Sequence, residues 1–349
     1  MPLDPSLRSG GEDEPGGGLL SSAAVAPAPA SGQDAFPGAS AETPALGPWK
    51  LALRRLRRKR LALAFLALFV VLVLLCLLAP VYAADIAHTG PNQENIINTL
   101  SPQGIPIGPT LTSHYFFGAD LNGRDLAVRL LYGGRNSLFI GAIATIIIIV
   151  FGTLFGLLCG YFRGVVDALL RPLMELIWSF PPVILGVAVG TALALGGIGP
   201  IKGNSLIVPA LIIGVIYIPY LGKPIRGEVL RLREQDFVEA ARVQGMGPWR
   251  IMLTEILPNV ASTITVFIPL MLAYSILLES YLSFLGAGVQ PPNASWGTLI
   301  SDGLDYLDTA PHLALIPGAM LVLTVLSINV FGDAVRDALD PRATQHVKT

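Results

Sequence analysis

The side chains that most often carry out covalent or metal chemistry are few in this sequence and far apart. There are four histidines and two cysteines: His88, His114, His312, His346, Cys76 and Cys159. No His-Glu-x-x-His pair occurs, both cysteines lie inside apolar runs, and no serine stands in a Gly-x-Ser-x-Gly motif. The spacing therefore gives no indication of a zinc site, a redox pair or a nucleophilic serine. We expect a chain that is not an enzyme and that holds no metal.

The lysines give no phosphate-binding motif. None of the five lysines follows a Gly-x-x-x-x-Gly frame, the spacing of the loop that holds nucleotide phosphates. If ATP drives this protein, another polypeptide must bind the nucleotide.

Two carboxylates, Glu175 and Glu279, lie within or beside long apolar runs. Ionisable residues inside a membrane are candidates for ion or proton pathways, so a secondary transporter that uses these two residues is one hypothesis. Both fall near the ends of the runs, where a carboxylate can reach water or headgroups. A structural role is the alternative for each, because a proton or sodium relay usually needs more groups.

The composition indicates a protein with many membrane spans. Of the 349 residues, 52% are hydrophobic and 13% are charged, and the mean hydropathy is +0.63, whereas soluble domains are roughly a quarter charged. The net charge of −1 gives no indication of nucleic-acid binding. Six runs with at most one charge reach the ~20 residues that a helix needs to cross a bilayer: 61–84, 136–162, 172–201, 203–222, 256–278 and 309–332. We expect an all-α integral membrane protein with six transmembrane helices.

The positions of lysine and arginine predict the orientation. With a cytoplasmic N-terminus, 19 of the 23 basic residues lie inside, and only Arg124, Arg129, Arg135 and Lys202 lie outside. This is the asymmetry that membrane proteins show. Both termini and the loop at 223–250 are therefore expected in the cytoplasm.

The N-terminal region combines a polar tail with a basic run. Residues 1–49 are rich in Gly, Pro, Ala and Ser and are expected to form a disordered cytoplasmic tail. A basic run, Arg54 to Arg60, precedes the first apolar run and would sit on anionic headgroups. Ala83 and Ala84 resemble a signal-peptide cleavage site. A retained span is favoured, because the basic region lies far from the N-terminus and the apolar run is long.

The stretch EAARVQGMGPWRIMLTEILPN, at 239–259, interrupts the apolar runs with polar residues. Asp236 and Glu239 have the spacing of a capping box, which predicts a helix over 237–244. Gly245 fits the left-handed residue that ends a helix. Pro248 fits the first turn of a second helix over 249–257, and Pro258 marks the entry to the next span.

This loop has too many apolar side chains for a solvated linker, so we expect it to dock into something. Ala240 and Ala241 make one side of the first helix small, which suits close approach by a partner. The alternative is that Glu239 only caps the helix and that the small side packs on this chain's own helices.

The same residues resemble a known motif. Glu239-Ala240-Ala241, followed after three residues by Gly245 and Met246 and then by Leu257-Pro258, resemble the EAA loop of ABC importer permeases. In that family the loop is a coupling helix that sits in a groove of a separate ATPase subunit. The resemblance implies that Glu239 starts and orients the helix, the alanines allow close approach and Gly245 makes the turn. The sequence departs from the family at Glu255, where an isoleucine is usual.

Three further segments, 117–138, 277–303 and 332–342, resemble dipeptide and oligopeptide permeases, and the single span before the core matches their C-type subunit. The resemblance implies a type I ABC importer permease fold, with one N-terminal span plus a five-span core, in a bacterial inner membrane. It also implies a second permease, two ATPase subunits that carry ATP and Mg²⁺, and an extracytoplasmic solute-binding protein. Nickel, glutathione and sugar-derived solutes use similar permeases, so the solute stays open.

The expected organisation follows from these runs and motifs. Residues 50–84 form the basic segment and first span, 85–135 an extracytoplasmic segment, 136–335 the core with its coupling loop at about 223–258, and 336–349 a cytoplasmic tail. Leu126, Leu130 and Leu131 predict an amphipathic helix on the membrane surface within the extracytoplasmic segment. In the loop at 287–311, Trp296 either anchors at the bilayer interface or, with Asp302, contacts the binding protein.

Overall fold

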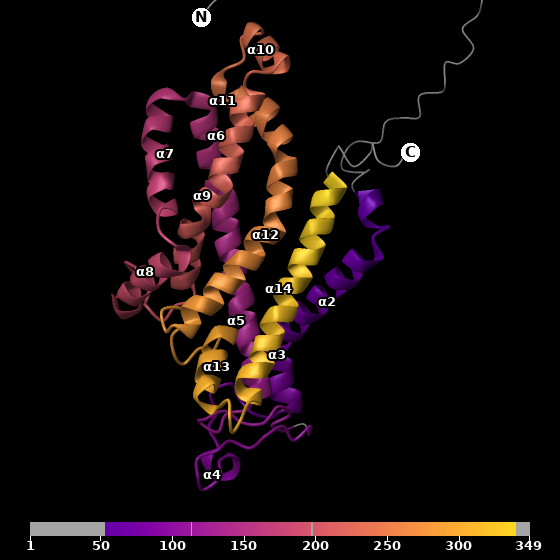
Figure 1. Cartoon of the computed structure of the whole chain (residues 1–349), viewed down its shortest axis with the longest axis vertical. Coiled ribbons are helices and arrows are strands. Elements are labelled where there is room, and N and C mark those ends of the chain that lie inside the picture. The colour runs from indigo at the N-terminus through magenta and orange to yellow at the C-terminus, as the bar shows by residue number, and fades with distance from the viewer. Residues whose placement is uncertain (1–52, 113, 197, 340–349) are drawn as a thin grey trace, which may run out of the picture. The chain divides into compact units, whose positions relative to one another are not determined.

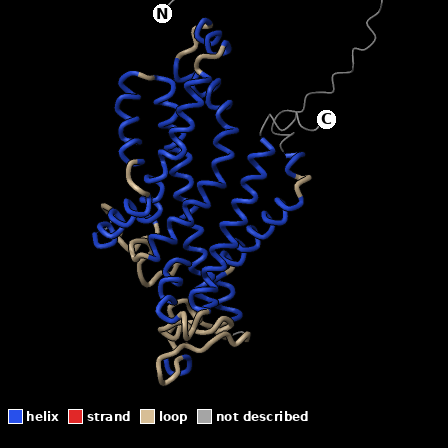
Figure 2. Tube along the Cα trace, viewed as in Figure 1, coloured by secondary structure: helices blue, strands red, loops and turns tan. Residues whose placement is uncertain are grey.

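The computed structural model describes residues 53–112, 114–196 and 198–339. The expected tails, 1–49 and most of 336–349, lie outside these residues. The chain divides into two units, 1–45 and 46–349, and all described residues belong to the second. Within it, helices run between an end that carries α10 and an end that carries α4 (Figure 1). Apart from isolated bridges, the described residues form only helices and loops (Figure 2).

Five helical stretches are long and apolar enough to cross a membrane. They are α2 (Arg60–Leu77), α5 with α6 (Leu126–Ile147 and Thr153–Phe162, joined by a π-helical turn), α9 (Ile207–Leu232), α11 with α12 (Pro248–Ile251 and Leu257–Phe284, joined likewise) and α14 (His312–Leu339). Helices suit these apolar runs because every backbone polar group finds a partner within the segment.

A sixth span is broken. Helix α7 (Gly164–Trp178) and helix α8 (Pro182–Gly196) meet at 92°. The apolar run at 172–201 was predicted to form one helix. This prediction is wrong, because the run is divided between two helices. Pro181 and Pro182 explain the break, because proline lacks the backbone N–H and disfavours a helical residue before it. With the bent pair taken as one span, the all-helical six-span fold is confirmed.

The amphipathic surface helix predicted between 85 and 135 is not present as a separate element. Leu126 and Leu130 lie in the first two turns of α5 and are buried. Asp125 caps α5, because its Oδ1 accepts hydrogen bonds from the N–H groups of Ala127 (2.8 Å) and Val128 (3.1 Å). The helix of the span therefore begins here, and the leucines pack on protein instead of lipid.

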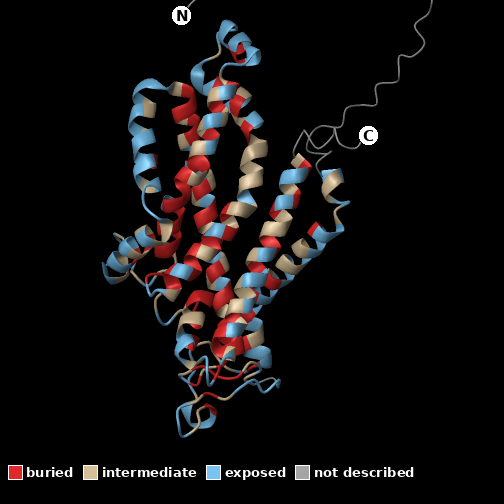
Figure 3. Ribbon diagram, in the orientation of Figure 1, coloured by how far each residue is buried: buried red, intermediate tan, exposed pale blue. Residues whose placement is uncertain are grey.

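The core lies where α5, α6, α9 and α12 pack together, and α7 and α8 are largely exposed (Figure 3). Gly152, Gly156 and Gly160 of this region face α9. A Cβ at Gly156 would lie 2.6 Å from Cβ of Ile225. These small residues allow the two helices to approach closely. Gly164, four residues after Gly160, begins α7 and has open space around it.

Short helices occupy the two ends. They are α3 (Ala79–Val81), α4 (Ile96–Thr99), α10 (Asp236–Val243) and α13 (Trp296–Gly303). Helix α10 lies at one end of the bundle, and α4 at the other (Figure 1).

Candidate functional site

Helix α10 forms where the sequence predicts it, within one residue at each end. The predicted capping box is wrong, because Gln235 is the N-cap and no side chain caps the helix. Gln235 has an extended backbone (φ −86°, ψ 150°), so Asp236 is already the first helical residue. Asp236 and Glu239 lie instead in the first turn, where negative charge favours the positive end of the helix dipole.

The turn after α10 has the geometry that was predicted for Gly245. Its φ is +80°. Its N–H donates to the carbonyl of Arg242 (2.9 Å), and the N–H of Met246 donates to the carbonyl of Ala241 (3.1 Å). This pair of bonds is a Schellman motif. Because no atom lies within 4 Å of a Cβ built at Gly245, the backbone conformation, and not space, demands glycine here.

The two alanines of α10 face opposite ways. Val238 and Ala241 are buried in a cluster with Ile251 and Met252 of the same chain. Glu239, Ala240 and Val243 are exposed, and Val243 is 84% exposed. Ala241 therefore packs on this chain's own helices, as the alternative interpretation had it, and Ala240 is the alanine that faces outward.

The second helix of the loop is the start of the next span. Gly247 is the N-cap of α11 and Pro248 occupies its first turn, which confirms the predicted restart. The helix then continues through a π-helical turn, 252–256, into α12, with Leu257 and Pro258 in the first turn. Proline removes one backbone donor, and a π-helical turn absorbs such a break. Glu255, the departure from the resembled motif, lies in this turn.

The base of the loop is fastened to the turn between α6 and α7. The rings of Trp249 and Phe162 lie 5.3 Å apart, and Arg163 pairs with Glu234 at 2.7 Å. Nearby, both guanidinium arms of Arg226 on α9 bind the carboxylate of Asp167 on α7, at 2.8 and 2.7 Å. These contacts join the loop base to the turn between α6 and α7, and α7 to α9.

At the α4 end, Trp296 lies in the core and not at a surface. It is fully buried among Leu126, Leu130 and Leu299, and its indole N–H donates to the carbonyl of Leu130 at 3.2 Å. The expected interfacial anchor, or contact by the ring with a soluble protein, does not fit this position, because the ring has no free surface.

Asp302 lines a cleft of about 350 Å³ at the same end, opposite Arg124, Arg129 and Gln290. Asp120 holds the two arginines, with Arg124 Nε at 2.7 Å and Arg129 Nε at 3.1 Å from its Oδ2. Asp302 has no cationic partner within 4 Å among the described residues. Desolvation within this cleft raises the pKa of the Asp302 carboxyl, although Arg129 and Arg124 oppose the shift.

The two intramembrane carboxylates have different surroundings. Glu175 pairs with Arg171 one turn earlier, at 2.8 Å, and both are exposed. Glu279 is fully buried, and Ser283 donates to its Oε1 at 2.6 Å. Ser283 in turn accepts from the N–H of Val289 at 3.0 Å, so Glu279 fixes the loop after α12. The structural alternative fits both residues.

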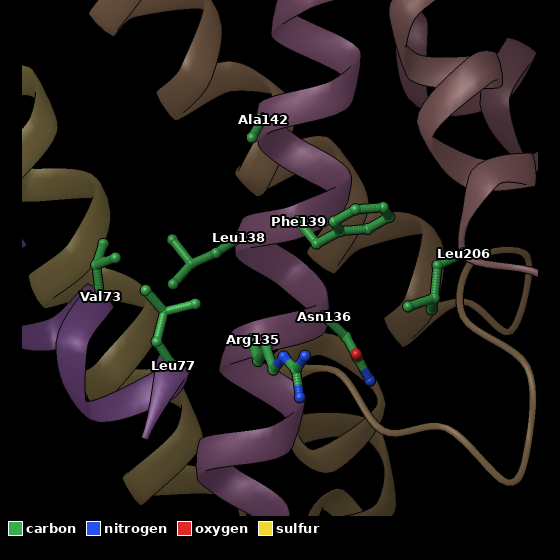
Figure 4. A pocket seen from close by; sticks show the side chains of 8 residues that line it. All are labelled: Val73, Leu77, Arg135, Asn136, Leu138, Phe139, Ala142 and Leu206. Atoms are coloured by element: carbon green, nitrogen blue, oxygen red, sulfur yellow. The ribbon is translucent and has the colours of Figure 1, made fainter. Parts of the chain in front are cut away.

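A further hollow, of about 490 Å³, lies between α2 and α5 (Figure 4). Its walls are mostly apolar, with Val73, Leu77 and Leu138 on one side and Leu206 across from them (Figure 4). Asn136 lies at its edge and is already bound to the carbonyl of Ala294 at 2.8 Å. Among the described residues that line the hollow, only Arg135 offers a polar group without a partner, so we assign no ligand to it.

The sequence patterns missed a row of aromatic side chains contributed by α7, α9 and α12. The row contains Trp178, Tyr217, Tyr220 and Tyr274, with Lys223 above the indole ring of Trp178. Only the tertiary packing brings these helices together, so no spacing in the sequence indicated it.

Comparison with known proteins places this architecture in a family. Residues 152–345 match the family described as "binding-protein-dependent transport system inner membrane component". Residues 47–102 match the family described as "N-terminal TM domain of oligopeptide transport permease C". The chain is 35% identical to the dipeptide transport system permease protein DppC of Alkalihalophilus pseudofirmus, over 85% of this chain and 91% of the relative. It is 35% identical to the oligopeptide permease OppC of Escherichia coli K12, over 84% and 91%. It is 33% identical to the glutathione permease GsiD of Pectobacterium atrosepticum, over 84% and 91%.

The fold also has a solved counterpart. An inward-facing structure of the methionine ABC transporter MetNI superposes with a TM-score of 0.50 at 18% identity. The match covers 61% of this chain and 96% of that chain.

Proposed function

Because this chain belongs to the family of binding-protein-dependent transport system inner membrane components, we propose that it is the C-type permease subunit of an ABC importer that moves di- or oligopeptides into the cytoplasm. The relatives named for dipeptides and oligopeptides, which match most of the chain, support the solute class. The chain carries out no covalent step. ATP and Mg²⁺ belong to two partner ATPase subunits, and a second, similar permease supplies the other half of the pathway.

The α10 end faces the cytoplasm in this proposal. The turn between α6 and α7, the loop around α10 and the basic start of α2 all lie at that end (Figure 1). They carry most of the chain's arginines, whereas Arg124, Arg129, Arg135 and Lys202 lie toward the α4 end. Basic residues accumulate on the cytoplasmic side of membrane proteins.

The observation that carries the proposal is the outward face of α10. Glu239, Ala240 and Val243 stand clear of the bundle with no side-chain partner among the described residues. This face carries a carboxylate, a small residue and an apolar side chain that is 84% exposed, which suits a groove in another protein. We assign this face and the Gly245–Met246 turn to docking on the ATPase. Leu257 and Pro258 connect it to the span.

Docking at this point can transmit force. The loop base is joined to α6, α7 and α9 by the Trp249–Phe162, Arg163–Glu234 and Arg226–Asp167 contacts. When two ATPases close on ATP, each would displace its loop and tilt these helices as a body. Such rigid-body movement exchanges inward-facing and outward-facing states.

At the α4 end we propose contact with the extracytoplasmic solute-binding protein. Asp302, Asp305 and Asp308 are exposed there, so the contact fits basic side chains of the partner. Trp296 supports this surface from beneath by fixing the start of α13.

The test is copurification. We would tag the chain, express it in its own host, extract it gently in detergent and identify the associated proteins by mass spectrometry. An ATPase and a second permease are expected, and the ATPase should be lost when Glu239 and Gly245 are both replaced by alanine. An Asp333→Ala variant is the matched control, because this exposed carboxylate lies on α14, outside the loop. A chain that purifies with no nucleotide-binding protein would contradict the proposal.

The alternative of a secondary transporter predicts a different result. It requires Glu175 or Glu279 to carry protons or sodium, and uptake would then fail in Glu279→Gln while assembly and ATPase activity persist. Because Glu279 is fully buried, a structural role is favoured. In that case Glu279→Gln should lose assembly and uptake together. Uptake assays with dipeptides, glutathione, nickel and sugars distinguish the solutes.

A further inference from the structure

A row of aromatic side chains crosses three helices in the middle of the predicted bilayer. The ring of Trp178 lies 4.1 Å from that of Tyr220, Tyr220 lies 4.9 Å from Tyr217, and Tyr217 lies 6.2 Å from Tyr274. Nζ of Lys223 lies 4.5 Å from the centre of the Trp178 ring. We refer to these five residues as the aromatic row.

The depth of the row sets it apart from an interfacial aromatic belt. Tyr217 is ten residues from the start of α9, and Tyr274 is ten residues from the end of α12. At ~1.5 Å per residue, each is about 15 Å from its helix end, half of a hydrocarbon core of ~30 Å. Tyrosines that anchor at the membrane surface lie near the ends of spans, so these two need another explanation.

Lys223 points into the membrane and not toward the nearer surface. Helix α9 runs toward the α10 end, and helical side chains tilt toward the N-terminus of their helix. The contact with Trp178, the last residue of α7, shows this direction. Arg226, one turn nearer the α10 end, is neutralised by Asp167. Lys223 has no carboxylate within 4 Å among the described residues. An unpaired positive charge therefore lies deeper in the membrane than the Arg226–Asp167 ion pair.

The row also presents unpaired hydroxyl groups on a partly open face. The hydroxyls of Tyr217, Tyr220 and Tyr274 make no hydrogen bond within the described part of the chain. Trp178 is 44% exposed and Tyr274 is 37% exposed, whereas Tyr217, between Tyr220 and Tyr274, is buried (8% exposed). Lipid tails cannot satisfy phenol or ammonium groups. This face therefore meets water or a polar ligand.

We propose that the aromatic row is a wall of the translocation pathway and that Lys223 binds the free carboxylate of the solute there. The ammonium supplies the counter-charge in a setting of low dielectric, and the rings pack against apolar side chains of the solute. This inference rests on the proposed function, since every peptide with a free C-terminus carries this carboxylate whatever its sequence. The second permease supplies the facing wall.

The test measures the charge environment of the row directly. In membrane vesicles that contain the assembled importer, Tyr274→Cys is labelled with an anionic (sulfonatoethyl) or a cationic (trimethylammonioethyl) methanethiosulfonate reagent. The native cysteines, Cys76 and Cys159, are fully buried, and the chain without the new cysteine gives the background. The two rates are normalised to those of a free thiol in solution.

The anionic reagent should react roughly five-fold faster than the cationic one. Lys223→Met should abolish this preference, Lys223→Arg should retain it, and the matched control Lys202→Met should leave it unchanged. Dialanine should slow the labelling several-fold, and dialanine amide should not. If Tyr274→Cys does not assemble, Tyr220→Cys takes its place.

Three results would overturn the inference: no labelling by either reagent, a charge preference that persists in Lys223→Met, or equal protection by the acid and the amide. Dipeptide uptake by the same vesicles separates this inference from the proposed function. Uptake without a charge preference at the row contradicts the site alone. A charge preference without uptake of any peptide contradicts the peptide importer and, with it, the carboxylate of a peptide as ligand.

Discussion

The indole nitrogen of Trp296 donates a hydrogen bond to the carbonyl oxygen of Leu130, 3.2 Å away, across 166 positions of sequence. This bond joins the start of α13 to the start of the span formed by α5 and α6. The ring also fills the space above Gly134, where a Cβ would lie 2.6 Å from the indole. Trp296 therefore holds two segments of the α4 end together.

Replacing this tryptophan should destabilise the fold. Trp296→Phe should cost roughly 1–3 kcal/mol, from one hydrogen bond and a small cavity, and Trp296→Ala roughly 3–5 kcal/mol. Thermal unfolding of the purified protein in detergent measures both. Trp249→Ala is the control, because that ring is 56% exposed and its loss should cost much less. Unchanged unfolding of Trp296→Ala, combined with lost delivery by the binding protein, would restore the view of Trp296 as a surface contact.

The contact between α6 and α9 predicts opposite outcomes for two glycines. A Cβ at Gly156 would lie 2.6 Å from Ile225 Cβ and 2.8 Å from the carbonyl oxygen of Gly222, whereas a Cβ at Gly227 meets nothing within 4 Å. Gly156→Ala should force the helices apart and cost roughly 1–3 kcal/mol. Gly227→Ala should be neutral or slightly stabilising. Unfolding temperatures of the two variants test this, and similar values for both would show that α9 yields easily.

Features that depend on the local pattern of residues could be predicted from the sequence. The six apolar runs placed the spans, and Gly245 and Pro248 placed the ends of two helices, because chain conformation at those residues is decided by their own chemistry. Two local details also failed, the capping box at Asp236 and the unbroken helix over 172–201. The other failures depended on neighbours distant in sequence. Hydropathy could not show that Leu126 and Leu130 pack on Trp296, nor that Ala241 packs inward while Ala240 faces out.

The same limit applies to the charged and aromatic groups. Glu279 and Asp302 could be singled out as carboxylates, yet only the fold shows that one is sealed among serines and the other lines an open cleft. The aromatic row draws on three helices that are up to 96 residues apart, from Trp178 to Tyr274. No single helix carries enough of it to produce a recognisable spacing.

Asp302 predicts a pH dependence of stability. Desolvation of its carboxyl within the cleft raises its pKa above the ordinary value of 3.8, so the folded protein holds a proton at pH values where the unfolded chain has released it. Stability from this group is then fully present below pH 3.8 and declines as the pH rises through the raised pKa of the folded state. Asp302→Asn should therefore unfold at a slightly higher temperature than the parent at pH 7, with the advantage vanishing near pH 4.

Asp305→Asn, at an exposed position outside the cleft, serves as the control. A variant that loses stability at pH 7 would reverse the sign and show that Arg129 and Arg124 dominate.

The turn at Gly245 gives the sharpest prediction for coupling. Its φ of +80° is closed to β-branched residues but open to asparagine at small cost. Gly245→Val should strain the Schellman motif by roughly 1–2 kcal/mol and misplace the face that carries Glu239 and Ala240. Copurification of the ATPase and peptide uptake should both fall about ten-fold or more, while the permease itself stays folded because a Cβ at this position would meet no atom within 4 Å. Gly245→Asn is the matched variant and should keep most of both activities.

Normal ATPase assembly and uptake in Gly245→Val would contradict the role of this turn. Equal loss in both variants would show that glycine is needed for contact with the partner and not for its backbone conformation.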